Sequence, residues 1–246
     1  MALLLPDKDP FGAAVKDYFE GNKKGKIRVF SNITTEEKMS AKYLFRTINT
    51  LPTLEKLALE SCYGKVLDIG AGAGSHSIIL QNRGFDVTAL DISQLNTQVI
   101  KKRGIRKVIN SDIFEFSGKK FDTLLLLMNG IGLAGNLEGL NSLLCHFRKL
   151  LNPGGQIIFD SSDIDYLYTD NEGGRWVNLN NEYYGEVIYQ LKYKKIYGKK
   201  FNWLFIDFEK ARNIAAQNGY TIKLLAKGDY FDYLAKLIPE NLTDGF

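Results

Sequence analysis

Glycines dominate the segment with the clearest chemical meaning, Val66-Leu67-Asp68-Ile69-Gly70-Ala71-Gly72-Ala73-Gly74. Glycine serves where the backbone must turn sharply and approach a ligand without a Cβ in the way. A dinucleotide-binding turn has the spacing G-x-G-x-x-G, whereas here the third glycine comes one position early and Ser75 stands in its place. Asp68 adds a carboxylate, which a pyrophosphate would not tolerate but a cationic ligand would. The segment predicts a site for a nucleotide-like ligand that carries positive charge.

Polar residues follow the next three expected strands. Asp91 ends the second strand, Asp112 follows the third, and Asn129 follows the fourth. The ligand crevice of an open parallel sheet lies at the carboxyl ends of its strands, so these residues are expected to meet at one edge. Taken singly, each acid is equally a helix cap or a turn residue. Their common register is what favours a ligand site.

The segment Asp68-Ile-Gly70-Ala-Gly72-Ala-Gly74 resembles the first motif, D/E-x-G-x-G-x-G, of class I (Rossmann-like) S-adenosylmethionine-dependent methyltransferases. Similarly, Leu150-Leu151-Asn152-Pro153-Gly154-Gly155 is similar to the L-L-x-P-G-G signature of that family. The matches cover about 65–160, and the chain from Asp9 to Tyr230 resembles an uncharacterised bacterial group of methyltransferase-like proteins. The resemblance implies S-adenosylmethionine as cofactor and S-adenosylhomocysteine as product, and it implies no particular acceptor.

The resemblance also implies roles at the cofactor site. An acid at the position of Asp91 binds both ribose hydroxyls, an apolar residue at that of Ile92 packs on adenine, and an acid at that of Asp112 accepts from the adenine amino group. Asn129 and Gly130 are expected beside the methionine end. The residues predicted to bind the cofactor are Asp68, Gly70, Ala71, Gly72, Gly74, His76, Asp91, Ile92, Ser93, Asp112, Ile113, Met128, Asn129 and Gly130.

No catalytic residue stands out in the sequence. Methyl transfer from a sulfonium is an in-line displacement that depends largely on proximity and orientation. A general base is needed only when the acceptor is protonated. Asp160 and Asp163 follow the fifth strand and His76 begins a helix, which makes these three the candidates. The alternatives are that Asp160 and Asp163 end the strand and start a turn, and that His76 is a half-exposed surface residue.

Aromatic and polar residues outside the core are candidates for holding the acceptor over the methyl group. Aromatic side chains can separate a small acceptor from water, and Arg46 can pair with an acidic acceptor or with the cofactor carboxylate. The alternative is that the aromatic residues form the core of a lid. The candidates are Tyr18, Tyr43, Arg46, Ser161, Tyr183 and Tyr184, with Phe45, Trp176, Tyr189 and Trp203 as further aromatic residues of the same regions.

Several other chemistries fit the sequence less well. The fourth strand ends in Asn129-Gly130-Ile131-Gly132, without the D/N-P-P-Y common in enzymes that methylate amines of bases or glutamine. Cys145 lies in a helical stretch and Cys62 precedes the first strand, so neither suits a nucleophile for cytosine C5. Two cysteines and two histidines in no paired motif predict no metal site. The early third glycine speaks against a nicotinamide oxidoreductase.

Composition and charge favour transfer to an oxygen or nitrogen of a small molecule. The 32 basic and 28 acidic residues give a net charge of +4, whereas nucleic-acid binders usually carry a denser basic surface. Basic clusters at 23–28, 101–107 and 192–200 would serve an RNA or protein acceptor if they converged on one rim of the site; otherwise they are solvated surface. A non-catalytic, cofactor-binding regulatory protein of the same fold is a third hypothesis. We expect a monomer or homodimer.

The sequence predicts a cytoplasmic protein without a membrane partner. No stretch approaches the roughly 18 apolar residues of a membrane helix. The start of the chain has a brief apolar run but no basic leader. Unpaired cysteines fit a reducing compartment.

Strand and helix signals alternate through the middle of the chain. Strands are expected at 65–69, 85–90, 106–109, 121–128 and 156–160, with helices at 75–82, 93–103 and 136–151. A helix at 207–218, a strand at 220–226 and a strand or short helix at 230–237 follow. The continuous apolar run Leu124–Leu127 is typical of a strand covered on both faces. The pattern predicts an α/β fold with a doubly wound, mostly parallel seven-stranded sheet and helices on both faces.

Two flanking regions depart from this pattern. Thr34-Thr35-Glu36-Glu37 looks like a capping box that opens a helix running to about Asn49, so residues 1–58 are predicted to form an N-terminal helical lid. Residues 184–197 and 201–205, joined at Gly198-Lys199-Lys200, predict a β-hairpin within a lid insertion at about 163–205, after the fifth strand. Residues 59–246 are assigned to the methyltransferase domain.

Overall fold

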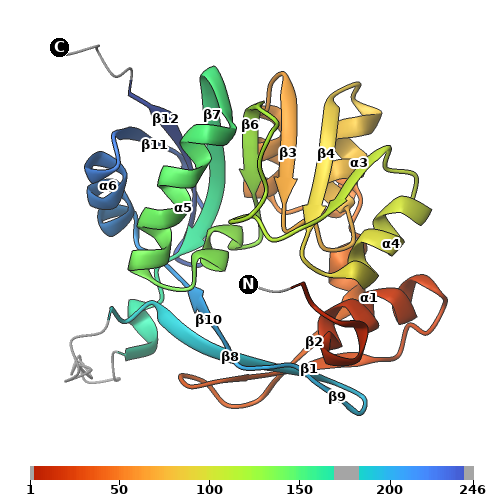
Figure 1. Cartoon of the computed structure of the whole chain (residues 1–246). Coiled ribbons are helices and arrows are strands. Elements are labelled where there is room, and N and C mark those ends of the chain that lie inside the picture. Colours follow the sequence, from red (N-terminus) through yellow and green to blue (C-terminus); the bar gives the residue numbers. More distant parts are fainter. Residues whose placement is uncertain (1–2, 169–182, 241–246) are drawn as a thin grey trace.

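The computed structural model describes residues 3–168 and 183–240 and contains two β-sheets (Figure 1). The larger sheet has seven strands in the order β11-β12-β7-β6-β3-β4-β5. Five adjacent strands, β7 to β5, run parallel, and β12 runs antiparallel to both of its neighbours. The predicted mostly parallel seven-stranded sheet is therefore confirmed. Its strands are β3 (Lys65–Ile69), β4 (Asp86–Asp91), β5 (Lys107–Asn110), β6 (Phe121–Leu126), β7 (Leu151–Ser162), β11 (Tyr220–Lys227) and β12 (Asp232–Pro239).

Helices cover both faces of this sheet because both faces are apolar. Leu124 and Leu126 of β6 belong to the core cluster that includes α5 (Leu137–Leu150) and α6 (Phe208–Gln217). Leu125 belongs to the opposite cluster, with α2 (Thr53–Glu60) and α3 (Ser75–Asn82). On this second face Ile100 of α4 (Gln94–Lys102) packs with Ala89 of β4. A strand buried on both faces needs such a continuous apolar run.

Side-chain caps fix where three of the helices begin. The side chains of Ser93, Asn136 and Asp207 accept backbone hydrogen bonds at the starts of α4, α5 and α6. Each satisfies one of the first-turn N–H groups that a helix leaves without an internal partner. The predicted helices at these places are found within one or two residues. β7 begins at Leu151, directly after α5 and earlier than the predicted 156, because Leu151 already pairs with Phe121 before a shift in register.

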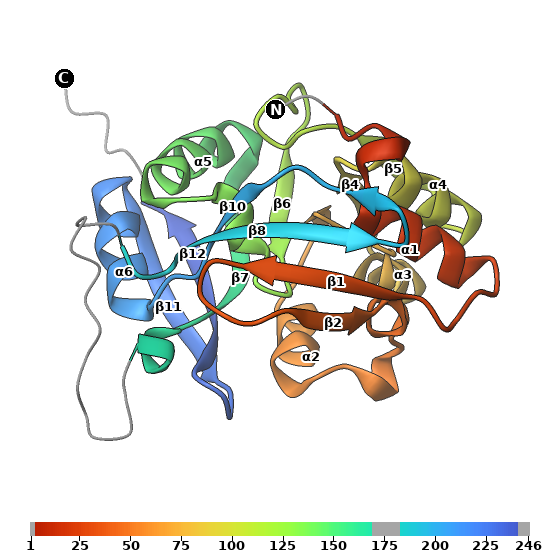
Figure 2. The same cartoon turned by 90° about the horizontal axis from the view of Figure 1, so that it is seen from below.

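The smaller sheet joins two parts of the chain that are far apart in sequence. Its order is β10-β8-β1-β2, with β9 paired to β8. The segments predicted as a hairpin pair antiparallel as β8 and β10, and β8 also pairs with β1. Figures 1 and 2 show this sheet across the end of the molecule towards which β3, β4 and β6 point. Its strands are β1 (Lys26–Ser31), β2 (Glu37–Ser40), β8 (Glu186–Tyr193), β9 (Ile196–Tyr197) and β10 (Phe201–Leu204).

The helix predicted from Thr34 to about Asn49 is wrong. This segment contains β2, paired antiparallel with β1, and then two short 3-10 helices, η2 (Ala41–Phe45) and η3 (Ile48–Thr50). The Thr34 hydroxyl does donate to Glu37 at 3.1 Å, but in the loop between β1 and β2, and Glu36 of the same loop pairs with Arg28. Strand pairing over distance has overridden the local capping signal. The N-terminal region is therefore not a purely helical lid.

Four further elements complete the N-terminal part and the loops. Helix α1 (Pro10–Phe19) follows the 3-10 turn η1 (Pro6–Lys8) and packs against α4 and β8. The turns η4 (Gly130–Ala134) and η5 (Asp165–Tyr168) follow β6 and β7. The predicted lid residue Trp176 lies outside the described residues. The division at residue 58 stays a prediction. Strands β1 and β2 of the N-terminal part share a sheet with β8 to β10.

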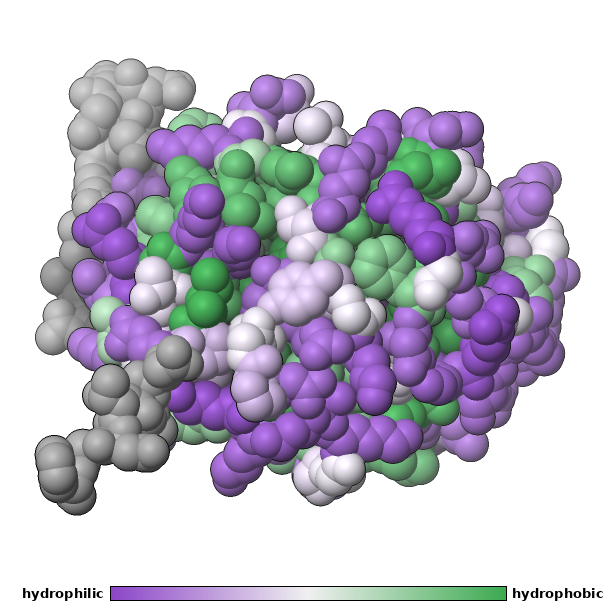
Figure 3. Space-filling model, turned by 90° about the horizontal axis from the view of Figure 1, so that it is seen from above, coloured by the Kyte–Doolittle hydropathy of each residue, from purple (hydrophilic) through white to green (hydrophobic). Residues whose placement is uncertain are grey.

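The opposite end of the molecule is largely polar. Figure 3 looks onto the edge where the parallel strands begin, and hydrophilic residues cover most of it, with smaller hydrophobic areas between them. The predicted site residues follow the other, carboxyl ends of the strands. In the described part of the chain, no helix combines the length and the hydropathy needed to cross a membrane.

Candidate active site

The glycine turn leaves the end of β3 open to a ligand. Gly70, Gly72 and Gly74 have φ angles of 71°, 57° and 81°, a region that side chains disfavour. A Cβ on Gly70 would meet no atom within 4 Å, and one on Gly72 only the Gly70 carbonyl oxygen at 3.9 Å. A Cβ on Gly74, by contrast, would come within 3.2 Å of Ile100, so this glycine lets α3 and α4 pack. The first two glycines thus border free space in which a ligand can approach the backbone.

Asp91, at the end of β4, is buried against this turn. The backbone N–H groups of Gly72 and Ser93 each donate to its carboxylate at 2.8 Å, and the Asn96 amide donates at 3.2 Å. Burial raises its pKa to about 6, and the nearby Asp9 carboxylate also raises it. A carboxylate that accepts from three N–H groups still keeps acceptor capacity for a hydroxyl donor. This geometry fits the predicted ribose contact, which stays a prediction.

Asp9 lies beside the end of β4, close to Asp91. The sequence patterns did not single it out as a site residue. Its side chain accepts from the Gly12 N–H at 2.7 Å, which caps α1, and from the Ser93 hydroxyl. Burial raises the pKa of this carboxyl as well. Leu4 forms an isolated bridge to Ser93. The start of the chain thus lies over the carboxyl end of β4, and the Asp9-Pro10 pair, a helix-start signal, could have indicated it.

The predicted adenine contacts lie at the same edge. Asp112 is buried and accepts from the Phe114 N–H at 3.0 Å, which makes a local turn. Ile113 is part of the main hydrophobic core, and Ile92 is half-buried. Their contact with adenine stays a prediction.

Asp68 ties the end of β3 to the following helix. It accepts the Ser77 hydroxyl at 2.5 Å and is buried. Burial raises its pKa, although the neighbouring His76 and the Ser77 hydrogen bonds oppose this. Asp68 therefore supports the glycine turn and adds negative charge beneath it.

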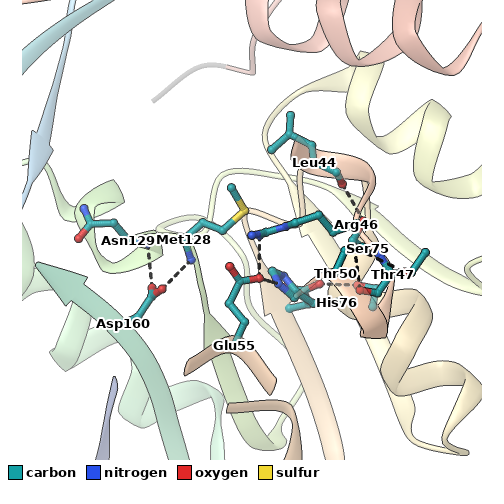
Figure 4. A network of polar contacts seen from close by, with 12 residues as sticks. Leu44, Arg46, Thr47, Thr50, Glu55, Ser75, His76, Met128, Asn129 and Asp160 are labelled. Atoms are coloured by element: carbon teal, nitrogen blue, oxygen red, sulfur yellow. Dashed lines mark hydrogen bonds and ion pairs between the residues drawn. The ribbon is translucent and has the colours of Figure 1, made fainter. Parts of the chain in front are cut away.

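Figure 4 shows three buried charged side chains joined beside the glycine turn. Glu55 of α2 accepts from Arg46 Nη2 at 2.7 Å, and the same Oε2 atom lies 2.6 Å from His76 Nε2. Burial would lower the pKa of His76, but the hydrogen bond with Glu55 and the carboxylates of Asp68 and Glu55 raise it above its usual value. His76 is thus a buried member of a network and not a half-exposed surface residue. Glu55 was missed; a carboxylate among the leucines of a short helix was the available signal.

The turn after β6 is strained and is held by Asp160. Met128 and Asn129 have φ angles of 63° and 55°, in the left-handed region that non-glycine residues seldom adopt. Their backbone N–H groups donate to the Asp160 carboxylate at 3.1 and 2.8 Å. Burial raises the pKa of Asp160 to about 7, and the Glu55 carboxylate contributes. Strain of this kind gathers at functional sites, where the surroundings enforce it.

Asn129 and Ser161 connect three strands. The Ser161 hydroxyl donates to the Asn129 side chain at 2.9 Å and accepts the Ile206 N–H at 3.0 Å. The Asn129 amide donates to the Leu204 carbonyl at 3.1 Å. Ser161 is almost completely buried, and these contacts give it a supporting role; its contact with an acceptor stays a prediction.

The remaining residues predicted to contact the acceptor lie in two separate regions. Tyr43 lies against Arg46, whose guanidinium carbon is 3.9 Å from the ring centre, and Tyr18 packs on Phe45. The hydroxyls of Tyr183 and Tyr184 donate instead to Asp207 and Asp163, at 2.6 and 2.7 Å. Burial and these carboxylates raise the pKa of both tyrosines. Asp163, Tyr183 and Tyr184 thus form a cluster at the start of α6, apart from the Arg46 network.

The inner face of the small sheet is aromatic. Tyr189 and Phe201 are directly paired, 6.1 Å between ring centres, and Phe201 is 6.1 Å from Trp203. Trp203 packs on Gly132 of η4, where an added Cβ would lie 2.2 Å from the indole Nε1. This contact fixes the aromatic face against the loops that follow the parallel strands. Within the described residues, no three His, Cys, Asp or Glu side chains gather in a way that could hold a metal.

The fold and this edge define a class I Rossmann-like methyltransferase architecture, and comparisons with known proteins agree. A family model described as a methyltransferase domain matches residues 35–221. The chain is similar to an S-adenosylmethionine-dependent methyltransferase from Bacteroides fragilis, whose crystal structure is in complex with S-adenosyl-L-homocysteine. The two sequences are 40% identical. The match covers 97% of this chain and 98% of that chain, with a TM-score of 0.92.

More distant relatives share less. A Pyrococcus horikoshii OT3 protein is 23% identical over 76% of this chain and 88% of its own, with a TM-score of 0.58, and shows the fold alone. Demethylmenaquinone methyltransferase of Tropheryma whipplei (strain Twist) is 30% identical over 100 residues, 38% of this chain and 40% of that protein. The chain spans about two-fifths of the length of the curated relatives it matches.

The chain therefore belongs to the class I S-adenosylmethionine-dependent methyltransferases. Members of this family use S-adenosylmethionine as cofactor, and the free space at Gly70 and Gly72 fits a ligand that approaches the backbone.

Proposed function

We propose that this chain transfers a methyl group to an oxygen or nitrogen of a small molecule by in-line displacement. The observation that carries the proposal is the aromatic inner face of the small sheet, which covers the edge holding the glycine turn, Asp91 and the Met128–Asn129 turn. Aromatic walls with a few polar groups are typical of small-molecule sites. S-adenosylmethionine supplies a methyl group bonded to a positively charged sulfur.

The protein's own residues orient the reactants and exclude water. Trp203 on Gly132 closes one side of the site, and Asp160 holds the turn after β6. A neutral amine acceptor needs no base, whereas a hydroxyl acceptor must lose its proton. The carboxyl of Asp160, with a pKa of about 7, can take up that proton near neutral pH. His76 is less suited to this step because its hydrogen bond with Glu55 and the nearby carboxylates raise its pKa and so favour the protonated form.

An unbiased labelling assay tests the acceptor class. The purified protein is incubated with methyl-tritiated S-adenosylmethionine and, in separate reactions, with a low-molecular-mass cell extract, total RNA and a protein fraction. We expect label in the small-molecule reaction, lost in Asp91→Ala. Label confined to RNA or protein contradicts the proposal, and label in no fraction favours a non-catalytic cofactor-binding protein.

RNA is the second candidate acceptor, and two of the basic clusters meet in the structure, but not on the rim of the site as an RNA acceptor requires. In the small sheet Arg28 of β1 is paired with Lys192 of β8, which joins the basic clusters 23–28 and 192–200. This face lies opposite the buried Ile27 and Tyr193, so the clusters meet on the outside of the sheet and not on the rim of the site. Binding of labelled RNA that weakens steeply with salt would favour this alternative; absence of binding at low salt favours the small acceptor.

A further inference from the structure

Arg46 carries buried charge without a full set of partners. Its side chain is 8% exposed and its Nη2 atom is bonded to Glu55. Nε and Nη1 are buried, and neither has a hydrogen-bond partner among the described residues. Buried polar groups are nearly always hydrogen-bonded, and leaving a charged donor unpaired is costly. These two donors therefore point to a ligand that is bound in the working protein.

The guanidinium is held in one position. Glu55 binds its Nη2 atom and the Tyr43 ring stacks 3.9 Å from its central carbon. The preceding turn η2 is anchored to the start of α3, because the Ser75 hydroxyl donates to the Leu44 carbonyl at 2.7 Å. Arg46 is thus fixed beside the glycine turn before any ligand arrives, which lowers the entropy lost on binding.

The surrounding charges select which ligand group can bind there. Asp68, Glu55 and Asp160 interact electrostatically with His76 at this end of the site. They favour cations, such as the ammonium and sulfonium groups of S-adenosylmethionine, and disfavour a free anion. The cofactor has a single anionic group, its carboxylate. A rigid guanidinium with open N–H donors is the group that matches a carboxylate.

We propose that Arg46 binds the carboxylate of the methionine portion of S-adenosylmethionine, with Glu55 and Tyr43 as its positioning residues. This extends the predicted cofactor site, which is formed by the glycine turn and the strand ends, to a residue supplied by the N-terminal part of the chain. The inference depends on the cofactor and not on the identity of the acceptor.

Binding measurements with two ligands test the proposal without any acceptor. S-adenosylhomocysteine has the carboxylate, and its decarboxylated analogue, S-adenosyl-3-thiopropylamine, retains the ammonium but lacks that group. By calorimetry we expect Arg46→Gln to weaken S-adenosylhomocysteine about 10–100-fold, since charged hydrogen bonds are lost. The analogue should bind the wild type and Arg46→Gln equally.

Two matched variants serve as controls. Arg28→Gln removes an arginine that also pairs with a glutamate but is exposed on β1, and it should leave both affinities unchanged. Arg46→Lys keeps the buried charge and should fold if the glutamine variant does not; it too should weaken only the ligand with the carboxylate. Equal weakening of both ligands, or unchanged binding of S-adenosylhomocysteine, overturns the proposal. The second result would leave an acidic acceptor as the partner of Arg46.

Discussion

Buried carboxylates surround the cofactor edge, and burial raises the pKa of each. The pKa of Asp91 is raised to about 6 and that of Asp160 to about 7, and those of Asp9 and Asp68 are raised as well. Because desolvation disfavours their charged forms, these groups make the ligand-free protein less stable at neutral pH than it would be with neutral groups. A cationic cofactor favours their ionised forms. At the residue scale, these carboxylates therefore lower the stability of the ligand-free protein and raise its affinity for a cationic cofactor.

Asp91 gives this exchange a measurable pH dependence. Its folded pKa is about 6 against an ordinary 3.8, so between these pH values the native state binds more protons than the unfolded state. The contribution of Asp91 to the free energy of unfolding therefore falls as the pH rises through this window, by up to about 3 kcal/mol. Asp91→Asn cannot titrate. We measure the free energy of unfolding of both proteins in urea without ligand. We expect the wild-type value minus the Asp91→Asn value to decrease between pH 4 and pH 7.

A difference between the two proteins that stays constant across this range would contradict the raised pKa. The same series should be run with Asp86→Asn as the control, because Asp86 begins the same strand and pairs with Lys107 at the surface. That variant should follow the wild type closely, as exposed ion pairs contribute little.

At the scale of elements, the N-terminal segment is attached to the large sheet by a few polar contacts. Asp9 both caps α1 and accepts the Ser93 hydroxyl at the end of β4. Glu55 and Ser75 connect η2 and α2 to the start of α3. Each of these contacts joins α1, η2 or α2 to a residue at the carboxyl edge of the large sheet. Loss of one contact should therefore destabilise the N-terminal segment more than the large sheet.

Removing the cap at Asp9 tests this attachment. Asp9→Ala should lower the free energy of unfolding by about 1–2 kcal/mol, since an N-cap and a buried hydrogen bond are lost together. Asp7→Ala, two residues earlier in the exposed turn η1, is the matched control and should change little. Thermal or urea unfolding measures both. Equal stability of the two variants would show that α1 does not depend on this cap.

The contact between η4 and β10 attaches the small sheet from the other side. A Cβ on Gly132 would lie 2.2 Å from Trp203 Nε1, too close to fit. We expect Gly132→Ala to destabilise the protein by about 1–3 kcal/mol, as overpacking does. Trp203→Ala should also destabilise the protein. The double variant should lose less free energy of unfolding than the two single variants together, because without Trp203 the added Cβ meets no clash. Strict additivity in urea unfolding would mean that the two residues do not touch.

At the scale of the whole molecule, local sequence patterns predict the large sheet. They do not predict how the small sheet and the N-terminal segment cover its carboxyl edge. The Leu124–Leu127 run and the caps at Ser93 and Asn136 are local signals, and the corresponding elements lie where expected. The sequence patterns predict no strand at β1 and a helix at 34–49, because β1 depends on pairing with β8 across more than 150 residues, which no local pattern encodes. Likewise, Glu55 meets Arg46 and His76 only through the path of η2 and η3.

The same architecture predicts how the cofactor acts on the molecule. The edge combines Asp91 and the glycine turn of the large sheet with Asp9, Arg46 and Glu55 from the N-terminal part. A ligand that bridges them should stabilise both parts together, by about 2.7 kcal/mol at one hundred times its Kd. We expect S-adenosylhomocysteine to raise the melting temperature and to slow hydrogen exchange at 41–55 as well as 66–76, with NAD as the inactive control. Protection confined to 66–76 would show that the cover takes no part in binding, because the core turn alone would then hold the ligand.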